Sequence, residues 1–513
     1  MKILKFFLEI FFNFILFFIL LLPLWLNKKF GFVYYDQLLL NLELSSLGLL
    51  DGDYRLFRSG VRWLVIIPLI LSILLYLIRY LFLKQKFNRN EVKKILIKSV
   101  DSIFSKRKKN KLLISLNKLF KISISIPVYF FLILIVSFYF YYNLTYIFKK
   151  NDTNNNQNSY LDKNYIYPKV DKFSKKNLIV IYVESLEETF TNKNIFGENL
   201  LKEISALPNS SKVKNFYQIP ETGFSIYSLI ASQCGIPLLK FGILEARQIG
   251  TLKKFLPNLT CLSDILKKNN YINTILTSDD SRHGGYDVFG KTHGFDEIID
   301  SRKLKDLNYR TSRSAWHRYE QNWYGGIHDN TLYQALIDIL KKKKILNKNF
   351  FISVHTIDTH SPKGYPNPKC LRKILKKAEI NNFDFTHSFI CSSRYLEKFI
   401  KEYNKLKMAN TNLVIIGDHL FMQSFDEVLE KDRKIFNSFL INQKFKIMRN
   451  DMNVFDLFPS FLNLAGVTLK NEQQQAGLGY SIFINNEEYK IINKPIKNQS
   501  NIYKKFWNEK KNY

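Results

Sequence analysis

Leu178-Ile-Val-Ile-Tyr-Val-Glu184-Ser185 decides the fold of this chain. An unbroken apolar run of this length, closed by a carboxylate, is typical of a strand buried on both faces of a parallel sheet. The predicted strands are Leu178–Val183, Asn273–Thr277, Phe350–His355 and Leu413–Ile416. The predicted helices between them include Phe224–Ser232, Leu259–Asn269, Leu332–Lys342 and Ser392–Leu406. We therefore expect an α/β domain with a mostly parallel central sheet covered by helices.

Polar residues follow three of these strands directly. Glu184 ends the first, Gly417-Asp418-His419 ends the last, and a segment from His355 to Pro362 follows the third. Ligands of open α/β sheets collect at the carboxyl ends of the strands. If Glu184, Asp418 and His419 converge there, they form a site with two oxygen ligands and one nitrogen ligand for a divalent cation. The alternative is that the acidic residues cap the following turns.

Two hydroxyl residues, Thr222 and Ser225, open the predicted helix between the first two strands. The N-terminus of a helix stabilises an anion through its dipole and its free N–H groups. A metal-bound hydroxyl in that position is a nucleophile able to attack phosphorus. The competing interpretation is an ordinary Thr or Ser helix cap.

Three stretches carry a family resemblance: Glu184-Ser-Leu-Glu187, Thr222-Gly-Phe-Ser225 running into Ala231-Ser-Gln-Cys-Gly-Ile-Pro-Leu238, and Gly417-Asp418-His419. They resemble phosphoglycerol transferase I enzymes, which modify osmoregulated periplasmic glucans, and the lipoteichoic acid synthases. Both groups belong to the sulfatase-like branch of the alkaline phosphatase superfamily. Weaker support comes from Lys291–Asp296, His328–Leu332 and Gly477–Ser481, so the resemblance covers most of residues 177–483.

This resemblance implies a covalent mechanism with one divalent metal ion. Manganese or zinc is the expected metal, and magnesium is the alternative. The implied metal ligands are Glu184, Thr222 or Ser225, Asp418 and His419. The same comparison suggests that His360 helps to hold the substrate phosphate. The phosphoglycerol headgroup would pass from phosphatidylglycerol to the enzyme hydroxyl and then to a glycan in the periplasm.

The nucleophile stays open between two hydroxyls. Related sulfatase motifs place it about ten residues before a Gly, and counting back from Gly235 reaches Ser225, whereas the metal-binding Thr of lipoteichoic acid synthases favours Thr222.

Phosphate recognition is also open. Where the lipoteichoic acid synthases have a phosphate-binding Arg, this chain has Tyr286. The candidate substrate-binding residues are Arg282, Lys291, His328 and Asp329.

Two other functions compete with phosphoglycerol transfer. One is transfer of phosphoethanolamine to lipid A or a glycan, and the other is a non-catalytic, membrane-anchored binding protein. A true sulfatase is disfavoured, because the segment that begins at Cys234 does not fit the C-x-P-x-R pattern.

The first 149 residues are predicted to form a membrane domain. Residues 3–26, 61–83 and 126–148 are long and apolar enough to span a bilayer. The loop 84–121 is rich in Lys and Arg and should be cytoplasmic. A polar linker (150–176) and a catalytic domain (177–513) should then lie in the periplasm of a bacterium, anchored in its inner membrane.

The net charge of +32 at pH 7 does not indicate nucleic-acid binding, because no basic stripe interleaved with aromatic residues occurs outside a membrane-flanking loop. Four cysteines lie in the predicted external domain: Cys234, Cys261, Cys370 and Cys391. In an oxidising compartment we expect two disulfides, and sequential pairing is the simplest of three connectivities. Four buried free thiols are the alternative.

Overall fold

The computed structural model describes residues 2–30, 54–84, 160–219, 222–238, 254–309, 326–361, 363–375, 383–422, 432–441, 445–485 and 505–507, with Phe425 and Tyr489. The chain divides into two compact units, residues 1–29 with 55–155 and residues 30–54 with 156–513. Each unit is described by itself.

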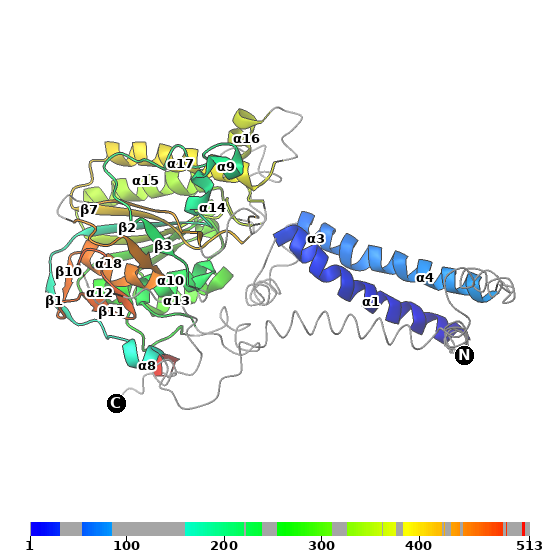
Figure 1. The fold of residues 1–513 in the computed structure, drawn as a ribbon. Coiled ribbons are helices and arrows are strands. Elements are labelled where there is room, and N and C mark those ends of the chain that lie inside the picture. Colours follow the sequence, from blue (N-terminus) through cyan, green and yellow to red (C-terminus); the bar gives the residue numbers. More distant parts are fainter. Residues whose placement is uncertain are drawn as a thin grey trace, which may run out of the picture. The chain divides into compact units, whose positions relative to one another are not determined.

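The first unit contains a pair of apolar helices. One is α1 (Lys2–Phe30), and the other is a continuous helical stretch of α3 (Tyr54–Val61), the π-helix η1 (Arg62–Ile66) and α4 (Ile67–Lys84). The two run antiparallel (Figure 1). The rings of Phe6 and Tyr76 lie 4.8 Å apart near one end, and Trp25 Nε1 donates to Ser59 Oγ at 3.1 Å near the other.

Large apolar side chains of this unit face outward. Phe7 and Phe12 are each 61% exposed. Among the described residues, one helical stretch, Arg58–Leu77, is long and apolar enough to cross a membrane, and a shorter apolar helix covers Glu9–Leu22. These helices overlap the first two predicted spans. The third, 126–148, lies outside the described residues, so the three-span topology stays a prediction.

A six-stranded sheet forms the centre of the second unit, in the order β5-β4-β6-β2-β7-β8. The strands are β2 (Asn177–Val183), β4 (Ile272–Thr277), β5 (Glu297–Ile299), β6 (Phe350–His355), β7 (Thr411–Gly417) and β8 (Asn437–Leu440). All are parallel except β8, which runs antiparallel to β7. The register pairs Tyr182 with His355 and Val183 with Gly417. The carboxyl ends of β6, β2 and β7 therefore lie side by side.

Helices cover both faces of this sheet (Figure 1). They are α10 (Ser225–Cys234), α12 (Leu262–Lys267), α13 (Tyr286–Thr292) and α18 (Leu457–Leu464) on one face, and α14 (Ser301–Asp306), α15 (Asp329–Leu346) and α17 (Phe385–Lys405) on the other. A hydrophobic core lies on each face of the sheet, and β2 contributes to both. Val180 and Tyr182 point into the core on the side of α10 and α18, and Ile181 and Val183 point into the core on the side of α15 and α17. Burial on both faces explains why its sequence lacks polar alternation.

Shorter elements surround the sheet. Three two-stranded ladders pair β1 (Val170–Phe173) with β10 (Val467–Leu469), β3 (Asn215–Tyr217) with β9 (Asp451–Asn453), and β11 (Gln475–Ala476) with β12 (Gly479–Tyr480). The remaining helices are α8 (Tyr160–Asn164), η2 (Glu188–Thr191), α9 (Lys193–Phe196), η5 (His283–Gly285), α16 (Pro368–Ile374) and η8 (Val454–Asp456).

All four predicted strands are present, and each predicted helix overlaps an observed one. Helix α17 begins earlier than predicted, because Asp384 caps it by accepting a hydrogen bond from the Thr386 N–H at 3.0 Å. The predicted linker, 150–176, is partly ordered: β1 pairs with β10, and Leu161 is fully buried. The linker was predicted from the Asn-rich run 151–156, and the exposed Asp171 and Lys172 left β1 without an apolar pattern that would have marked it as a strand.

Candidate active site

The carboxylate cluster consists of Glu184, Asp418 and His419, which meet where β2 and β7 end. Each is 3% exposed, and their possible ligand atoms all lie within 4.8 Å of one another. His419 Nε2 lies 3.4 Å from Glu184 Oε1 and 3.5 Å from Asp418 Oδ2. Gly417 permits this approach, because a Cβ there would lie 1.9 Å from the carbonyl oxygen of Leu186.

Ser185 orients the two carboxylates of this cluster. Its hydroxyl donates to Glu184 Oε1 at 2.6 Å, and its N–H donates to Asp418 Oδ1 at 2.8 Å. The residue has a φ of 56°, in the left-handed region that residues other than glycine rarely adopt. Backbone strain of this kind persists where the surroundings hold it, and it gathers at functional sites.

The imidazole of His419 is oriented by the backbone. Its Nδ1 lies 2.8 Å from the carbonyl oxygen of Leu420, and its own N–H donates to Asp418 Oδ1 at 2.8 Å. A proton on Nδ1 directs the Nε2 lone pair toward the carboxylates, as in a metal-binding histidine.

The electrostatics of the cluster are those of a cation site. Burial, together with the negative charge of Glu184, raises the pKa of Asp418 from 3.8 to about 6. Burial alone would lower the pKa of His419, but Asp418 and Glu184 outweigh it, so the pKa is raised. Two crowded carboxylates and one imidazole are the donor set that a divalent cation prefers, so the residues present fit such an ion.

The two candidate nucleophiles differ in where their hydroxyls point. Thr222 is fully buried, and its hydroxyl donates to the carbonyl of Ile219 at 2.8 Å and accepts from the Ile219 N–H at 3.2 Å. Ser225 is the first residue of α10, and its hydroxyl donates to Glu184 Oε2 at 3.2 Å. The structure thus brings Ser225, and not Thr222, to the carboxylate cluster.

The far end of α10 is firmly anchored. Gly235 ends the helix with a φ of 71°, and a Cβ there would lie 2.8 Å from the Phe458 ring and 2.9 Å from Gly477. A disulfide joins Cys234, the last residue of α10, to Cys261 at the start of α12. These contacts position the helix whose first residue is Ser225.

A second disulfide joins Cys370 in α16 to Cys391 in α17. The pairing in the structure is therefore the sequential one predicted, and it leaves no free cysteine among the four.

His360 adjoins the cluster from the segment after β6. Thr359, the residue before it, donates its hydroxyl to the Glu184 carbonyl at 2.5 Å. The Nδ1 of His360 lies 2.8 Å from the carbonyl of Ser361. Burial and the neighbouring His419 lower the pKa of His360 to about 4, so this imidazole is neutral at neutral pH.

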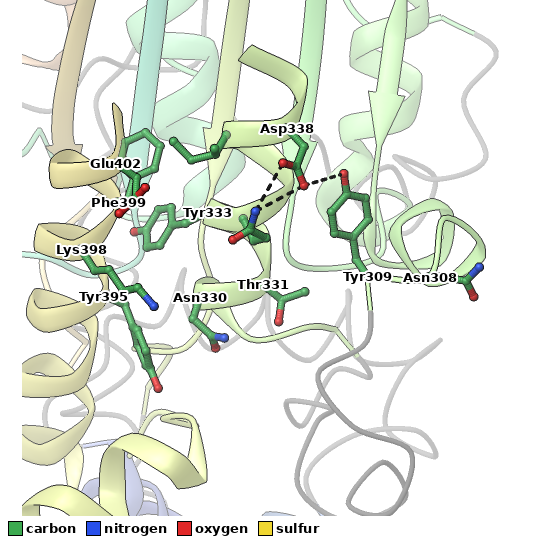
Figure 2. A pocket seen from close by; sticks show the side chains of 12 residues that line it. Asn308, Tyr309, Asn330, Thr331, Tyr333, Asp338, Tyr395, Lys398, Phe399 and Glu402 are labelled. Atoms are coloured by element: carbon green, nitrogen blue, oxygen red, sulfur yellow. Dashed lines mark hydrogen bonds between the residues drawn. The ribbon is translucent and has the colours of Figure 1, made fainter. Parts of the chain in front are cut away.

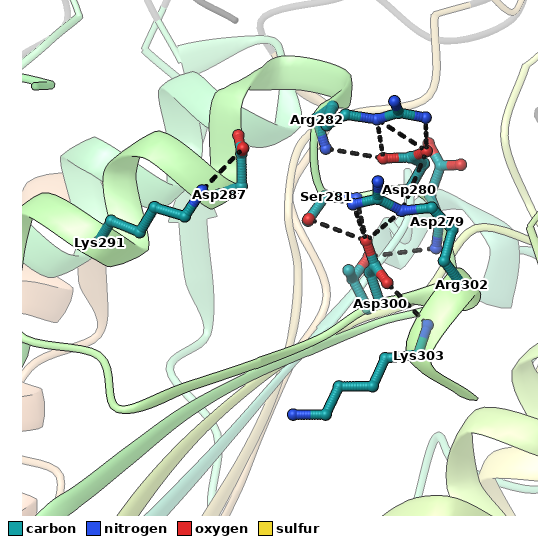
Figure 3. Close-up of polar contacts among 10 residues, drawn as sticks. Asp279, Asp280, Ser281, Arg282, Asp287, Lys291, Asp300, Arg302 and Lys303 are labelled. Carbon is teal, nitrogen blue, oxygen red and sulfur yellow. Dashed lines mark hydrogen bonds and ion pairs between the residues drawn. The ribbon is translucent and has the colours of Figure 1, made fainter. Parts of the chain in front are cut away.

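Arg282 and Lys291 are exposed, and each lies beside its own carboxylate (Figure 3). Arg282 Nη2 lies 2.5 Å from Asp280 Oδ2, and Lys291 Nζ lies 3.6 Å from Asp287 Oδ2. Their side chains are 63% and 71% exposed. Among the described residues, neither contacts the carboxylate cluster.

His328 and Asp329 form a buried network at the start of α15. His328 Nδ1 lies 2.9 Å from Asp358 Oδ1. The carboxylate of Asp329 accepts from the backbone N–H groups of Ile357 and Asp358, at 2.9 and 3.2 Å, and from the Ser278 hydroxyl at 3.1 Å. Burial and the nearby Asp358 raise the pKa of Asp329 well above its usual value. Asp329 thus joins α15 to the ends of β4 and β6.

Two neighbours of the cluster were not predicted as site residues. Ser185 has no local signal beyond following Glu184. Tyr286 begins α13, and its ring lies 4.8 Å from that of His355, which in turn stacks on Tyr182 at 4.7 Å. Burial and the charges of Asp418 and Glu184 raise the pKa of Tyr286 well above its usual value, so its hydroxyl stays protonated. The available signal was the resemblance to lipoteichoic acid synthases, which implied a phosphate-binding residue at the position of Tyr286.

Part of this chain is similar in sequence to known proteins. Phosphoglycerol transferase I of Escherichia fergusonii is 30% identical over 341 residues, which cover 63% of this chain and 42% of the relative. The protein of that name from Salmonella arizonae is 34% identical over 258 residues, or 49% of this chain and 32% of the relative. The matches thus span less than half of these relatives' length.

A lipoteichoic acid synthase from Listeria monocytogenes gives a TM-score of 0.47 at 18% identity, covering 62% of this chain and 79% of that one. The family model described as Sulfatase matches residues 176–467, which is more than half of the 513 residues and includes every member of the carboxylate cluster. The chain therefore belongs to the sulfatase family, with its α/β fold and mostly parallel central sheet.

Proposed function

We propose that this chain is a metal-dependent phosphotransferase that moves phosphoglycerol from phosphatidylglycerol to a periplasmic glycan through a covalent intermediate on Ser225. One observation carries the assignment of the nucleophile: Ser225 Oγ lies 3.2 Å from Glu184 Oε2 at the start of α10. The relatives named phosphoglycerol transferase I support the class of reaction.

Glu184, Asp418 and His419 would hold one divalent cation, with manganese or zinc favoured and magnesium possible. Such an ion lowers the pKa of a hydroxyl and offsets the charge on a phosphoryl group. The N-terminus of α10 adds the backbone N–H groups of its first turn and the positive end of the helix dipole, which favour an anion at the same position.

In the first half of the reaction, Ser225 Oγ attacks the phosphorus of the donor. A P–Oγ bond forms while the bond from phosphorus to the diacylglycerol oxygen breaks, and that oxygen takes up a proton. The hydroxyl proton of Ser225 leaves toward Glu184 Oε2, which already accepts its hydrogen bond. In the second half, the acceptor hydroxyl loses its proton and attacks the same phosphorus, and Ser225 Oγ leaves and is protonated. His360 would contact the phosphoryl group in both halves.

The test uses the full chain in vesicles that contain labelled phosphatidylglycerol or phosphatidylethanolamine. Release of diacylglycerol from the first lipid and a phosphoglycerol adduct on Ser225, detected by mass spectrometry, are expected. Ser225→Ala should abolish both. Thr222→Ala is the matched control, because among the described residues its hydroxyl bonds to the backbone of Ile219 alone. Its loss should cost about 1 kcal/mol of stability and leave the adduct. Diacylglycerol release by Ser225→Ala at the parent rate would refute the proposed nucleophile, and headgroup loss only from phosphatidylethanolamine would refute the proposed donor.

We also propose that the chain crosses the bacterial inner membrane several times, with the second unit in the periplasm. The apolar helices α1 and α4 support membrane insertion. A membrane-impermeant thiol reagent should label a cysteine introduced within residues 151–170 and should not label one within 100–110. The reverse pattern would contradict this topology.

A further inference from the structure

A groove of about 400 Å³ runs between α15 and α17, outside the carboxylate cluster (Figure 2). Its volume lies in the range of about 300–1,000 Å³ that is usual for small-molecule sites. Both helices cover the same face of the sheet and belong to the same hydrophobic core.

Aromatic side chains form much of the wall. Tyr333 and Phe399 are 3% and 2% exposed, and their rings stack with centroids 5.3 Å apart. This pair is held by the core and forms a rigid floor. Tyr309 and Tyr395 are only partly buried and also line the groove. Aromatic rings offer a flat apolar surface, while the tyrosine hydroxyls add polar contacts.

The polar groups of the groove are weakly engaged with each other. Tyr309 donates to Asp338 Oδ2 at 3.4 Å, and Gln334 Nε2 lies 3.4 Å from both oxygens of Asp338. These distances are long for hydrogen bonds, so a ligand hydroxyl at a shorter distance can replace them. The Tyr333 hydroxyl is buried and has no hydrogen-bond partner within the described part of the chain.

The lining indicates the class of ligand. Asp338 and Glu402 lie beside Lys341 and Lys405, at 3.5 and 2.7 Å, which offset their charges. Lys398 is the single cation in the lining, so the groove lacks the group of cations that a phosphate site needs. Amides, carboxylates and hydroxyls along its length do not suit an acyl chain. Flat aromatic rings beside neutral and acidic hydrogen-bonding groups suit a neutral ligand with many hydroxyls and apolar C–H faces. That description fits a sugar chain.

One end of the groove is connected to the proposed active site through a chain of bonded residues. Asn330 lines the groove and follows Asp329 in the chain. The carboxylate of Asp329 accepts a hydrogen bond from the N–H of Asp358, in the segment after β6. The next residue, Thr359, donates to the Glu184 carbonyl at 2.5 Å. From Asn330 to Asp338 the helix rises by about 12 Å, which is room for a few sugar units.

We propose that the groove between α15 and α17 binds an oligosaccharide segment of the acceptor and so retains the acceptor beside the carboxylate cluster. The acceptor role rests on the proposed phosphoglycerol transfer, whereas saccharide binding can be measured without it.

The binding test is a calorimetric titration of the full chain in detergent with a linear glucose hexasaccharide, in the absence of any lipid donor. Tyr395→Ala should weaken binding about tenfold through the loss of one aromatic face, and the exposed Gln334→Ala should weaken it about fivefold. The matched controls are Tyr167→Ala, at a 49% exposed tyrosine away from the groove, and Glu397→Ala, on α17 but not in the groove lining. Both controls should bind like the parent, and the melting temperature of each variant reports on its folding.

Diacylglycerol release from phosphatidylglycerol, measured without saccharide, separates this inference from the proposed function. The groove variants should release diacylglycerol at the parent rate but transfer less phosphoglycerol to the hexasaccharide. If the parent releases none, the proposed function fails while the titration still decides saccharide binding. Three results would overturn the assignment of the groove. They are no binding of the hexasaccharide, equal binding by the parent and the groove variants, and displacement of the sugar by inorganic phosphate.

Discussion

Asp418→Asn should make the metal-free protein more stable while removing its response to metal. The substitution deletes one of the two crowded negative charges. It keeps an oxygen that can accept the hydrogen bonds now made to Asp418 Oδ1 by the N–H groups of Ser185 and His419. If the cluster holds the proposed cation, the carboxylate of Asp418 serves metal binding at the expense of the metal-free fold.

The size of this effect follows from the pKa of Asp418, which burial and Glu184 raise from 3.8 to about 6. At 1.36 kcal/mol for each pKa unit, ionising this buried carboxyl costs the metal-free protein about 3 kcal/mol. The cost is absent below pH 3.8, where the carboxyl is protonated in both folded and unfolded chains. It develops as the pH rises toward 6 and is complete at pH 7. The Asn variant should thus match the parent near pH 4 and exceed it by about 3 kcal/mol at pH 7.

A bound cation should offset most of this difference. At a free manganese concentration of 100 times the dissociation constant, binding stabilises the parent by about 2.7 kcal/mol and should leave the variant unchanged. The assay is urea unfolding followed by circular dichroism, in a chelator or in manganese, from pH 4 to pH 7. Asp306→Asn, at an exposed residue, is the control for loss of a carboxylate. The reasoning fails if metal-free Asp418→Asn is no more stable than the parent at pH 7, or if manganese still stabilises it.

Three further changes test the fold and the site. Arg433 is buried, and its Nη2 lies 2.5 Å from Glu187 Oε2. Glu187→Ala leaves this arginine without its partner, so the free energy of unfolding in a urea titration should fall by about 3–5 kcal/mol. A loss below about 1 kcal/mol would contradict a buried pair. Replacing both Cys234 and Cys261 with serine opens a loop of 27 residues, and thermal unfolding should show a loss of about 3.5 kcal/mol, whereas an unchanged midpoint would argue against the disulfide. Tyr286→Phe should lower kcat for diacylglycerol release about tenfold without changing the melting temperature, because it removes only a hydroxyl whose pKa is raised by burial and by the charges of Asp418 and Glu184; turnover at the parent rate would exclude a role for that hydroxyl.

The strands of the central sheet were predictable because their burial leaves a local trace. A strand covered on both faces needs apolar side chains at every position, and β2 and β7 show unbroken runs of this kind. The ligand candidates were predictable for a related reason, since the carboxyl ends of parallel strands meet at one edge. Strand β1 was missed, because Asp171 and Lys172 point to solvent and only pairing with β10 makes the segment a strand.

The sequence by itself determined the apolar helices, the parallel sheet and the residue types at the strand ends, because hydrophobic pattern is a property of neighbouring residues. Only the tertiary structure distinguished Ser225 from Thr222. Both hydroxyls suit the start of a helix, but Ser225 reaches Glu184, 41 residues away in the chain, while Thr222 bonds to Ile219 nearby. Hydrogen-bond partners depend on which distant segments the fold brings within about 3 Å, and no local pattern of residue types encodes that distance.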